Sequence, residues 1–256
     1  MIANYHTHTW RCKHAVGTEE EYVQAAIKRG LKRLGFADHS PYCFPDGYYS
    51  NFRMKPEDTA EYASDIFTLR DRYRDSIDIR LGVEIEYYPA FFADTVSMLR
   101  DNHVEYLILG QHFLDNEIGG SAYSGIPSTS ADDLKKYCRQ VMDACHTGLV
   151  TYIAHPDLFH YNGDTETYQR LMREMCREAR ACGVPLELNL LGVAEGRHYP
   201  REIFWEAAAE EGCKIILGCD AHSPDALLDT NSEKRALEMA KKWGMEVLED
   251  VPLRHL

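Results

Sequence analysis

The stretch Ile2-Ala3-Asn4-Tyr5-His6-Thr7-His8 decides the fold, because it joins a short apolar strand directly to a His-x-His motif. Side chains two residues apart on a strand point to the same side, so these two imidazoles face the same way. A third imidazole, that of His14, follows shortly after. Clustered imidazoles bind transition metals such as zinc, manganese and iron. The sequence therefore predicts a metal site where the first strand ends.

The same arrangement recurs along the chain. We expect further strands at residues 33–37, 79–85, 106–110, 150–154, 186–188 and 214–217, separated by helices. This alternation indicates parallel strands joined by crossover helices. Polar residues end or follow every later strand, and in chain order they are Asp38 and His39, Glu84, Gln111 and His112, His155, Asn189, and Asp220 and His222.

Two folds are compatible with this alternation, a closed α/β barrel and an open doubly wound sheet. In a barrel the carboxyl ends of all strands meet at one rim, where active sites lie. An open sheet would bring fewer strand ends together. Because metal-binding residues follow nearly every strand, we expect a barrel, formed as a single domain by residues 1–256.

Composition narrows the classes of partner. The formal net charge of −13 argues against binding extended nucleic acid, which requires Lys and Arg opposite the phosphates. No apolar run reaches the ~18 residues of a membrane helix, and no secretory signal is evident, so a cytoplasmic location is the default expectation. The eight cysteines include no C-x-x-C and are expected to be reduced thiols. The sequence leaves the oligomeric state open.

Most single histidines in proteins bind no metal, and His103, His146, His198 and His255 are assigned to that class. Repeated placement at strand ends is poorly explained by chance. The candidate metal ligands are too many for one ion and suit three ions with bridging carboxylates. They are His6, His8, His14, His39, Glu84, His112, His155, Asp220 and His222.

In type and order these residues resemble the PHP superfamily, the polymerase and histidinol phosphatase group, over nearly the whole chain. Within it, the sequence most resembles the histidinol-phosphate phosphatases. The matching stretches are residues 6–15, residues 36–41, and Leu186-Glu187-Leu188-Asn189 with Gly196-Arg197 after it. The resemblance implies a distorted (β/α)7 TIM-like barrel that holds three divalent metal ions, zinc, manganese or iron.

Carried over residue by residue, the resemblance implies a first ion on His6, His8, Glu84 and Asp220. It implies a second ion on Glu84, His112 and His155, and a third on His14, His39 and His222.

The activity implied is hydrolysis of L-histidinol phosphate to histidinol and phosphate, a step of histidine biosynthesis. Our hypothesis is that a metal-bridging hydroxide at the trinuclear centre attacks phosphorus in line, because bound metals lower the pKa of water toward ~7. Asp220 and Arg197 are the candidate catalytic residues, and Arg197 is also expected to bind the substrate phosphate. Asp38 and His160 are alternatives for orienting a ligand or donating a proton.

Two rival functions stay open. One is a PHP phosphoesterase acting on another small phosphoester or a nucleotide, and the other is a non-catalytic metal-binding PHP module. Surface roles are expected for Arg11 and Arg53, while Asp115 and Glu117 are considered as partners for a substrate ammonium group. The aromatic-rich loop at 41–52 is interpreted either as a wall of the substrate site or as a loop packed on the barrel.

Overall fold

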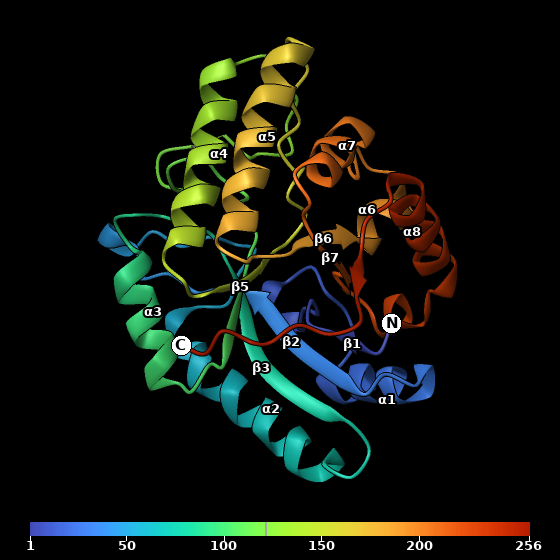
Figure 1. Ribbon diagram of the computed structural model, residues 1–256. Helices are drawn as coiled ribbons and strands as arrows, with labels where there is room; N and C mark the ends of the chain where they lie inside the picture. The colour runs from blue at the N-terminus through green and yellow to red at the C-terminus, as the bar shows by residue number, and fades with distance from the viewer. Residues whose placement is uncertain (121) are drawn as a thin grey trace.

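Parallel strands in chain order make up one curled sheet (Figure 1). The computed structural model describes residues 1–120 and 122–256. The eight strands of the sheet are β1 (Ala3–Asn4), β2 (Arg33–His39), β3 (Asp78–Ile85), β4 (Tyr106–Leu109), β5 (Val150–Ile153), β6 (Leu186–Asn189), β7 (Ile215–Gly218) and β8 (Val247–Leu248). The predicted TIM-like α/β architecture is confirmed, and a short eighth strand is added to the seven.

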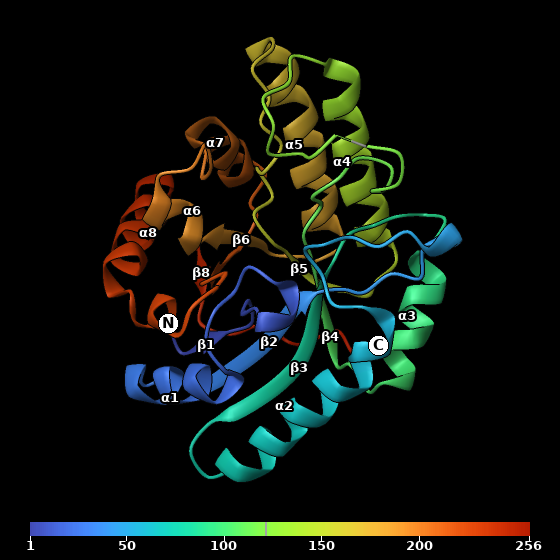
Figure 2. The same cartoon turned by 180° about the vertical axis from the view of Figure 1, so that it is seen from behind.

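Helices cover the outside of the curled sheet (Figures 1 and 2). They are α1 (Glu19–Arg29), α2 (Thr59–Tyr73), α3 (Phe92–Asp101), α4 (Ala131–His146), α5 (Thr165–Ala181), α6 (Leu190–Glu195), α7 (Glu202–Glu210) and α8 (Thr230–Trp243). The start of α1 follows from its sequence: Thr18 and Glu21 form a capping box, in which the Thr18 N–H donates to Glu21 Oε2 at 2.6 Å. None of the helices in the described residues is both long and apolar enough to cross a bilayer.

Strand β7 and the residues just after it contact both the first and the last strands of the sheet. At the rim, Thr7 beyond β1 forms a parallel bridge with Ala221 beyond β7, and the His8 N–H donates to the Ala221 carbonyl at 3.0 Å. At the opposite end of the same strand, Ile215 and Ile216 pair with β8. The sheet therefore curls until its first strand meets its seventh at the rim, while β8 extends the base.

The alternation of side chains along each strand separates an outer core from an inner one. Outward residues such as Leu81 and Val83 join the large apolar cluster beneath the helices. Inward residues, including Tyr5, Tyr106 and Tyr152, form a smaller cluster that fills the barrel below the rim. This inner layer supports the polar residues above it, at the carboxyl ends of the strands.

Candidate metal centre

All nine predicted metal ligands converge at the carboxyl rim, although they come from both ends of the chain and from between. His6 and His8 follow β1, His39 ends β2, Glu84 lies in β3, and the others follow later strands or a short 3-10 helix at Trp10–Cys12. The structure groups them by threes, with the ligand atoms of each group within 4.8 Å of one another. Such groups are His6, His8 and Glu84; His6, His155 and Asp220; His39, Glu84 and His112; and His14, His39 and His222.

Glu84 lies at the centre of these groups. Its Oε1 is 2.8 Å from His155 Nε2 and 3.5 Å from His112 Nε2. Its other oxygen, Oε2, is 3.1 Å from His39 Nδ1 and 3.7 Å from His8 Nε2. Because the two carboxylate oxygens face different imidazoles, this side chain has the geometry of a bridge between two ions.

Asp220 occupies a second central position. Its Oδ1 is 3.1 Å from His8 Nε2 and 3.4 Å from both His6 Nε2 and His222 Nδ1. Asp220 and His155 also have positive φ angles, 48° and 30°, a region that non-glycine residues seldom adopt. Such backbone strain clusters at functional sites, where the surrounding structure holds it in place.

Three buried carboxylates lie behind the imidazoles. Glu187 Oε1 is 2.7 Å from His6 Nδ1, and Glu86 Oε1 is 2.8 Å from His112 Nδ1. Asp38 Oδ1 lies 3.4 Å from His8 Nδ1, so the ring that it faces is that of His8 and not that of the adjacent His39. A carboxylate on one ring nitrogen fixes the ring and leaves the other nitrogen for a metal.

Glu86 and Glu187 are not among the site residues predicted from the sequence. A signal for each was present. Glu86 lies two residues after Glu84 and so shares its face of the strand, and Glu187 interrupts an otherwise apolar strand between Leu186 and Leu188. A charged residue in a strand buried on both faces requires a partner.

The electrostatics of the cluster are strongly coupled. Burial lowers the pKa of His6, but the negative charges of Glu187, Asp220 and Glu84 outweigh burial and raise it well above the usual value. Burial raises the pKa of Glu84, but the neighbouring imidazoles hold it well below the usual range. For His39, burial and the charge of His8 lower the pKa well below normal, which leaves a neutral imidazole.

These residues fit divalent metal ions. The four groups above consist of imidazole and carboxylate, donors that suit zinc, manganese and iron. The buried Nδ1 atoms of His39 and His155 have no hydrogen-bond partner among the described residues, although His39 Nδ1 lies 3.1 Å from Glu84 Oε2. Buried polar atoms without partners are uncommon and often mark the position of an ion.

A cavity of about 680 Å³ opens over the cluster. Its walls include the imidazoles of His14, His39, His112, His155 and His222, together with Glu84 and Asp220. Arg197 also lines it, with Nε donating to Glu195 Oε2 and Nη1 to the Tyr199 hydroxyl, each at 2.8 Å. Lys13 provides a second cation and Glu195 an anion. The candidate phosphate-binding arginine therefore lies at the same cavity as the predicted ligands.

Several loop residues differ from expectation. Arg53 is 1% exposed, not a surface residue, because it pairs with Glu86 and Glu117 and donates to the Ser40 carbonyl. Arg11 is also buried, paired with Glu19 and Asp65.

The expected ammonium partners also differ. Asp115 pairs with Lys136 and Glu117 with Arg53, and neither lines the cavity, whereas Glu195 does. His160 stacks on His198, with ring centroids 4.1 Å apart, away from the cavity lining.

One part of the aromatic loop at 41–52 lines the cavity, and another part packs on the barrel. Phe52 lines the cavity and packs edge-on against His39, with ring centroids 5.3 Å apart. Tyr42 and Phe44 instead pack on Tyr88. One end of the loop thus forms a wall of the cavity, while the other end anchors it to the barrel.

Comparison with known proteins identifies the family. The PHP domain model matches residues 4–190. The chain belongs to the PHP domain family. A "Probable histidinol-phosphatase" of Deinococcus radiodurans is 32% identical over 231 residues, 87% of each chain. The "Histidinol-phosphatase" of Bacillus subtilis is 31% identical over 118 residues, 43% of each chain. These PHP relatives confirm the predicted enzyme class, a phosphoric monoester hydrolase.

A solved PHP structure agrees with the fold. Histidinol phosphate phosphatase from Lactococcus lactis, crystallised with zinc, L-histidinol and phosphate, superposes with a TM-score of 0.73. The sequences are 20% identical, and the match covers 96% of this chain and 95% of the other. At that identity the match supports the architecture of this PHP protein and not its substrate.

Proposed function

We propose that this PHP-family phosphatase, a single domain over residues 1–256, hydrolyses L-histidinol phosphate to histidinol and phosphate. One observation carries the proposal: nine imidazole and carboxylate side chains from distant strands form one cluster, and seven of them line a cavity that also contains an arginine. The similarity to histidinol-phosphatases supports the choice of substrate.

Three divalent ions are proposed, zinc, manganese or iron. His6, His8, Glu84 and Asp220 would hold the first, Glu84, His112 and His155 the second, and His14, His39 and His222 the third. When bound, the ions would neutralise the phosphoryl oxygens and make a water molecule acidic enough to act as a nucleophile at neutral pH. Glu84 and Asp220 are suited to bridging because each lies within 4 Å of several imidazoles.

The chain supplies the remaining recognition of phosphate. Arg197 is held by Glu195 and Tyr199, so its guanidinium enters the cavity in a fixed orientation. A guanidinium can bind two phosphate oxygens with parallel N–H donors. Lys13 adds a flexible positive charge at the same cavity. Both cations can bind the dianionic group without contributing to metal binding.

The cavity also offers contacts for the leaving group, histidinol. Histidinol carries an imidazole and an ammonium group. Phe52, Phe113 and Tyr123 offer aromatic surfaces to the imidazole, and Glu195 offers a carboxylate to the ammonium. The cavity volume of about 680 Å³ suits a small molecule and not a polymer.

The test is phosphate release by protein loaded with zinc, manganese or iron. L-histidinol phosphate is compared with a panel of small phosphoesters, nucleotides and phosphotyrosine. We expect kcat/KM for L-histidinol phosphate to exceed every other value. A higher value for another panel member would replace the substrate, and no hydrolysis by metal-loaded protein would favour a metal-binding module.

A further inference from the structure

Cys12, in the loop between His8 and His14, has surroundings unlike those of the other buried cysteines. Cys138, Cys145, Cys176, Cys213 and Cys219 all belong to the large apolar core. Cys12 is 0% exposed but belongs to neither apolar cluster of the described residues. It lines the cavity instead, beside His14.

The local backbone directs Cys12 toward the centre. Residues Trp10–Cys12 form a short 3-10 helix, which Thr9 caps by accepting a hydrogen bond from the Arg11 N–H. Lys13 has a φ of 68° and ends the helix, so the chain reverses between Cys12 and His14. The His14 ring then bonds back to the Cys12 carbonyl at 2.7 Å.

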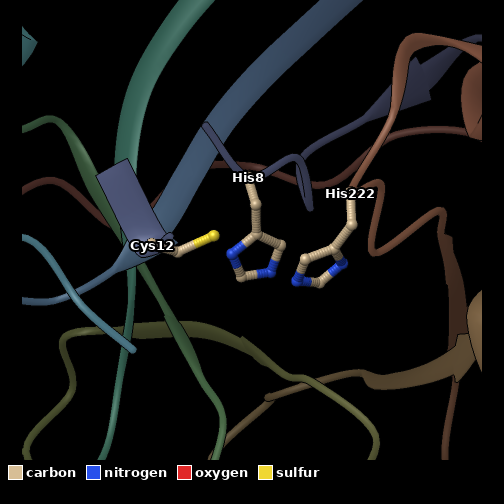
Figure 3. A group of neighbouring side chains, drawn as sticks. All are labelled: His8, Cys12 and His222. Atoms are coloured by element: carbon tan, nitrogen blue, oxygen red, sulfur yellow. The ribbon is translucent and has the colours of Figure 1, made fainter. Parts of the chain in front are cut away.

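The sulfur lies within reach of the metal ligands. The ligand atoms of His8, Cys12 and His222 all lie within 4.8 Å of one another. Figure 3 shows the Cys12 sulfur directed at the His8 ring, with His222 beside that ring on the other side. In a tetrahedral zinc site, bonds of about 2.0–2.3 Å set ligand atoms roughly 3.3–3.8 Å apart. A small shift would therefore bring the Cys12 sulfur within bonding distance of an ion held by His222.

We propose that Cys12 is a tenth protein ligand of the centre, binding through sulfur the ion that His222 holds. Binding displaces the thiol proton. Thiolate is a soft ligand that favours zinc over manganese, whereas the two ion positions that include the Glu84 carboxylate accept either metal. The consequence is a centre with unequal positions, in which the one at Cys12 retains zinc most strongly. This inference rests on the proposed metal centre but not on the proposed substrate.

The experiment is cobalt substitution followed by absorption spectroscopy. Thiolate ligation of Co²⁺ gives an intense near-ultraviolet charge-transfer band that imidazole and carboxylate ligands do not give. We expect this band in the wild-type protein and its loss in Cys12→Ser. The matched control is Cys43→Ser, which removes an exposed thiol of the same chain and should keep the band.

A second readout is metal preference in competition between Zn²⁺ and Mn²⁺. We expect Cys12→Ser to lose about tenfold of the preference for zinc while retaining its manganese content.

The outcomes separate the two proposals. Wild-type protein that binds cobalt without the band, or a Cys12→Ser variant that keeps it, overturns the role of Cys12 and leaves the phosphatase proposal standing. If the band depends on Cys12 but the protein does not hydrolyse L-histidinol phosphate, the role of Cys12 stands and the proposed substrate is overturned. Protein that binds no cobalt overturns both the centre and its sulfur ligand.

Discussion

At the scale of single residues, Glu187 contacts two of the predicted ligands without being one of them. Its Oε1 fixes the His6 ring, and its Oε2 accepts from the His155 N–H at 2.9 Å and from the Asn189 side chain at 2.8 Å. It therefore ties together the ends of three strands. Removing its charge should disturb two proposed ligands without removing either.

We expect Glu187→Gln to weaken metal affinity about 10- to 100-fold, the usual effect of losing a carboxylate behind a ligating histidine. Metal content after dialysis measures this, and excess metal should restore much of the activity. Glu246→Gln, on the exposed Lys214 pair, is the control. Unchanged metal retention in Glu187→Gln would show that the carboxylate does not orient His6.

Arg197 makes a different prediction, because it lines the cavity but belongs to none of the ligand groups. Loss of its charge-assisted hydrogen bonds, worth about 1.5–3 kcal/mol, should lower kcat/KM roughly 10- to 100-fold in Arg197→Ala. Metal content should stay at the wild-type level. Arg235→Ala, on the exposed face of α8, serves as control. Equal activity in the two variants would remove Arg197 from the site.

A Lys13 variant tests whether Arg197 alone is sufficient to bind the substrate phosphate. Lys13 lines the cavity, and its ammonium lies 4.3 Å from the centre of the Tyr49 ring. We expect Lys13→Met to raise KM several-fold with little change in kcat, since a flexible exposed cation adds to capture more than to the chemical step. Steady-state kinetics at low and high salt measure this, and an unchanged KM at low salt would contradict it.

At the scale of strands and loops, glycine makes room for the central carboxylate. A Cβ on Gly110, just after β4, would lie 2.0 Å from Glu84 Oε1. A Cβ on Gly35 in β2 would instead meet the Tyr106 hydroxyl at 2.2 Å, in the inner apolar layer. The two positions therefore suffer similar crowding with different neighbours.

Overpacking of this kind costs about 1–3 kcal/mol, so both Gly110→Ala and Gly35→Ala should lower the melting temperature. Only Gly110→Ala should also lose metal, because Glu84 must move. Thermal melts and metal analysis of both variants check this. Equal metal content in the two variants would mean that the position of Glu84 is more tolerant than the structure indicates.

Much of this element scale could be predicted from the sequence. Strand periodicity and the polar residues at strand ends were enough to identify the barrel and to group residues such as Glu84 and Asp220. The burial of Arg53 could not be predicted, because its partners Glu86 and Glu117 lie 33 and 64 residues away. Helix α6 was also missed, since a six-residue helix carries too little periodicity.

At the scale of the whole molecule, the centre links stability to pH and metal. In metal-free protein the pKa values of His6 and His8 are raised by buried carboxylates. A histidine whose pKa is higher in the folded state than in the unfolded state stabilises the fold when it is protonated. This contribution is present below the ordinary histidine pKa of about 6.5 and is lost as pH rises through the pKa values of the folded protein. His39 and His222 have lowered pKa values, that of His222 falling to about 3, so their contribution falls as pH drops below 6.5.

We therefore expect the melting temperature of metal-free protein to be highest near pH 6.5. Bound ions require deprotonated ligands, so metal-loaded protein should instead keep or gain stability above that pH. Chelation should lower the melting temperature most at alkaline pH, because binding to the folded state alone stabilises it. Parallel pH profiles of the two forms would contradict this coupling.

The shared strand β7 also determines the order in which the protein can be completed. A ribosome releases His6 and His8 long before Asp220 and Ala221, to which the rim joins them, because six other strands lie between the two segments. Such distant pairing is slow, because a long loop must close before any contact forms. The nascent polypeptide therefore carries these two imidazoles without their Asp220 partner until the segment after β7 has been made, and the centre can be completed only then.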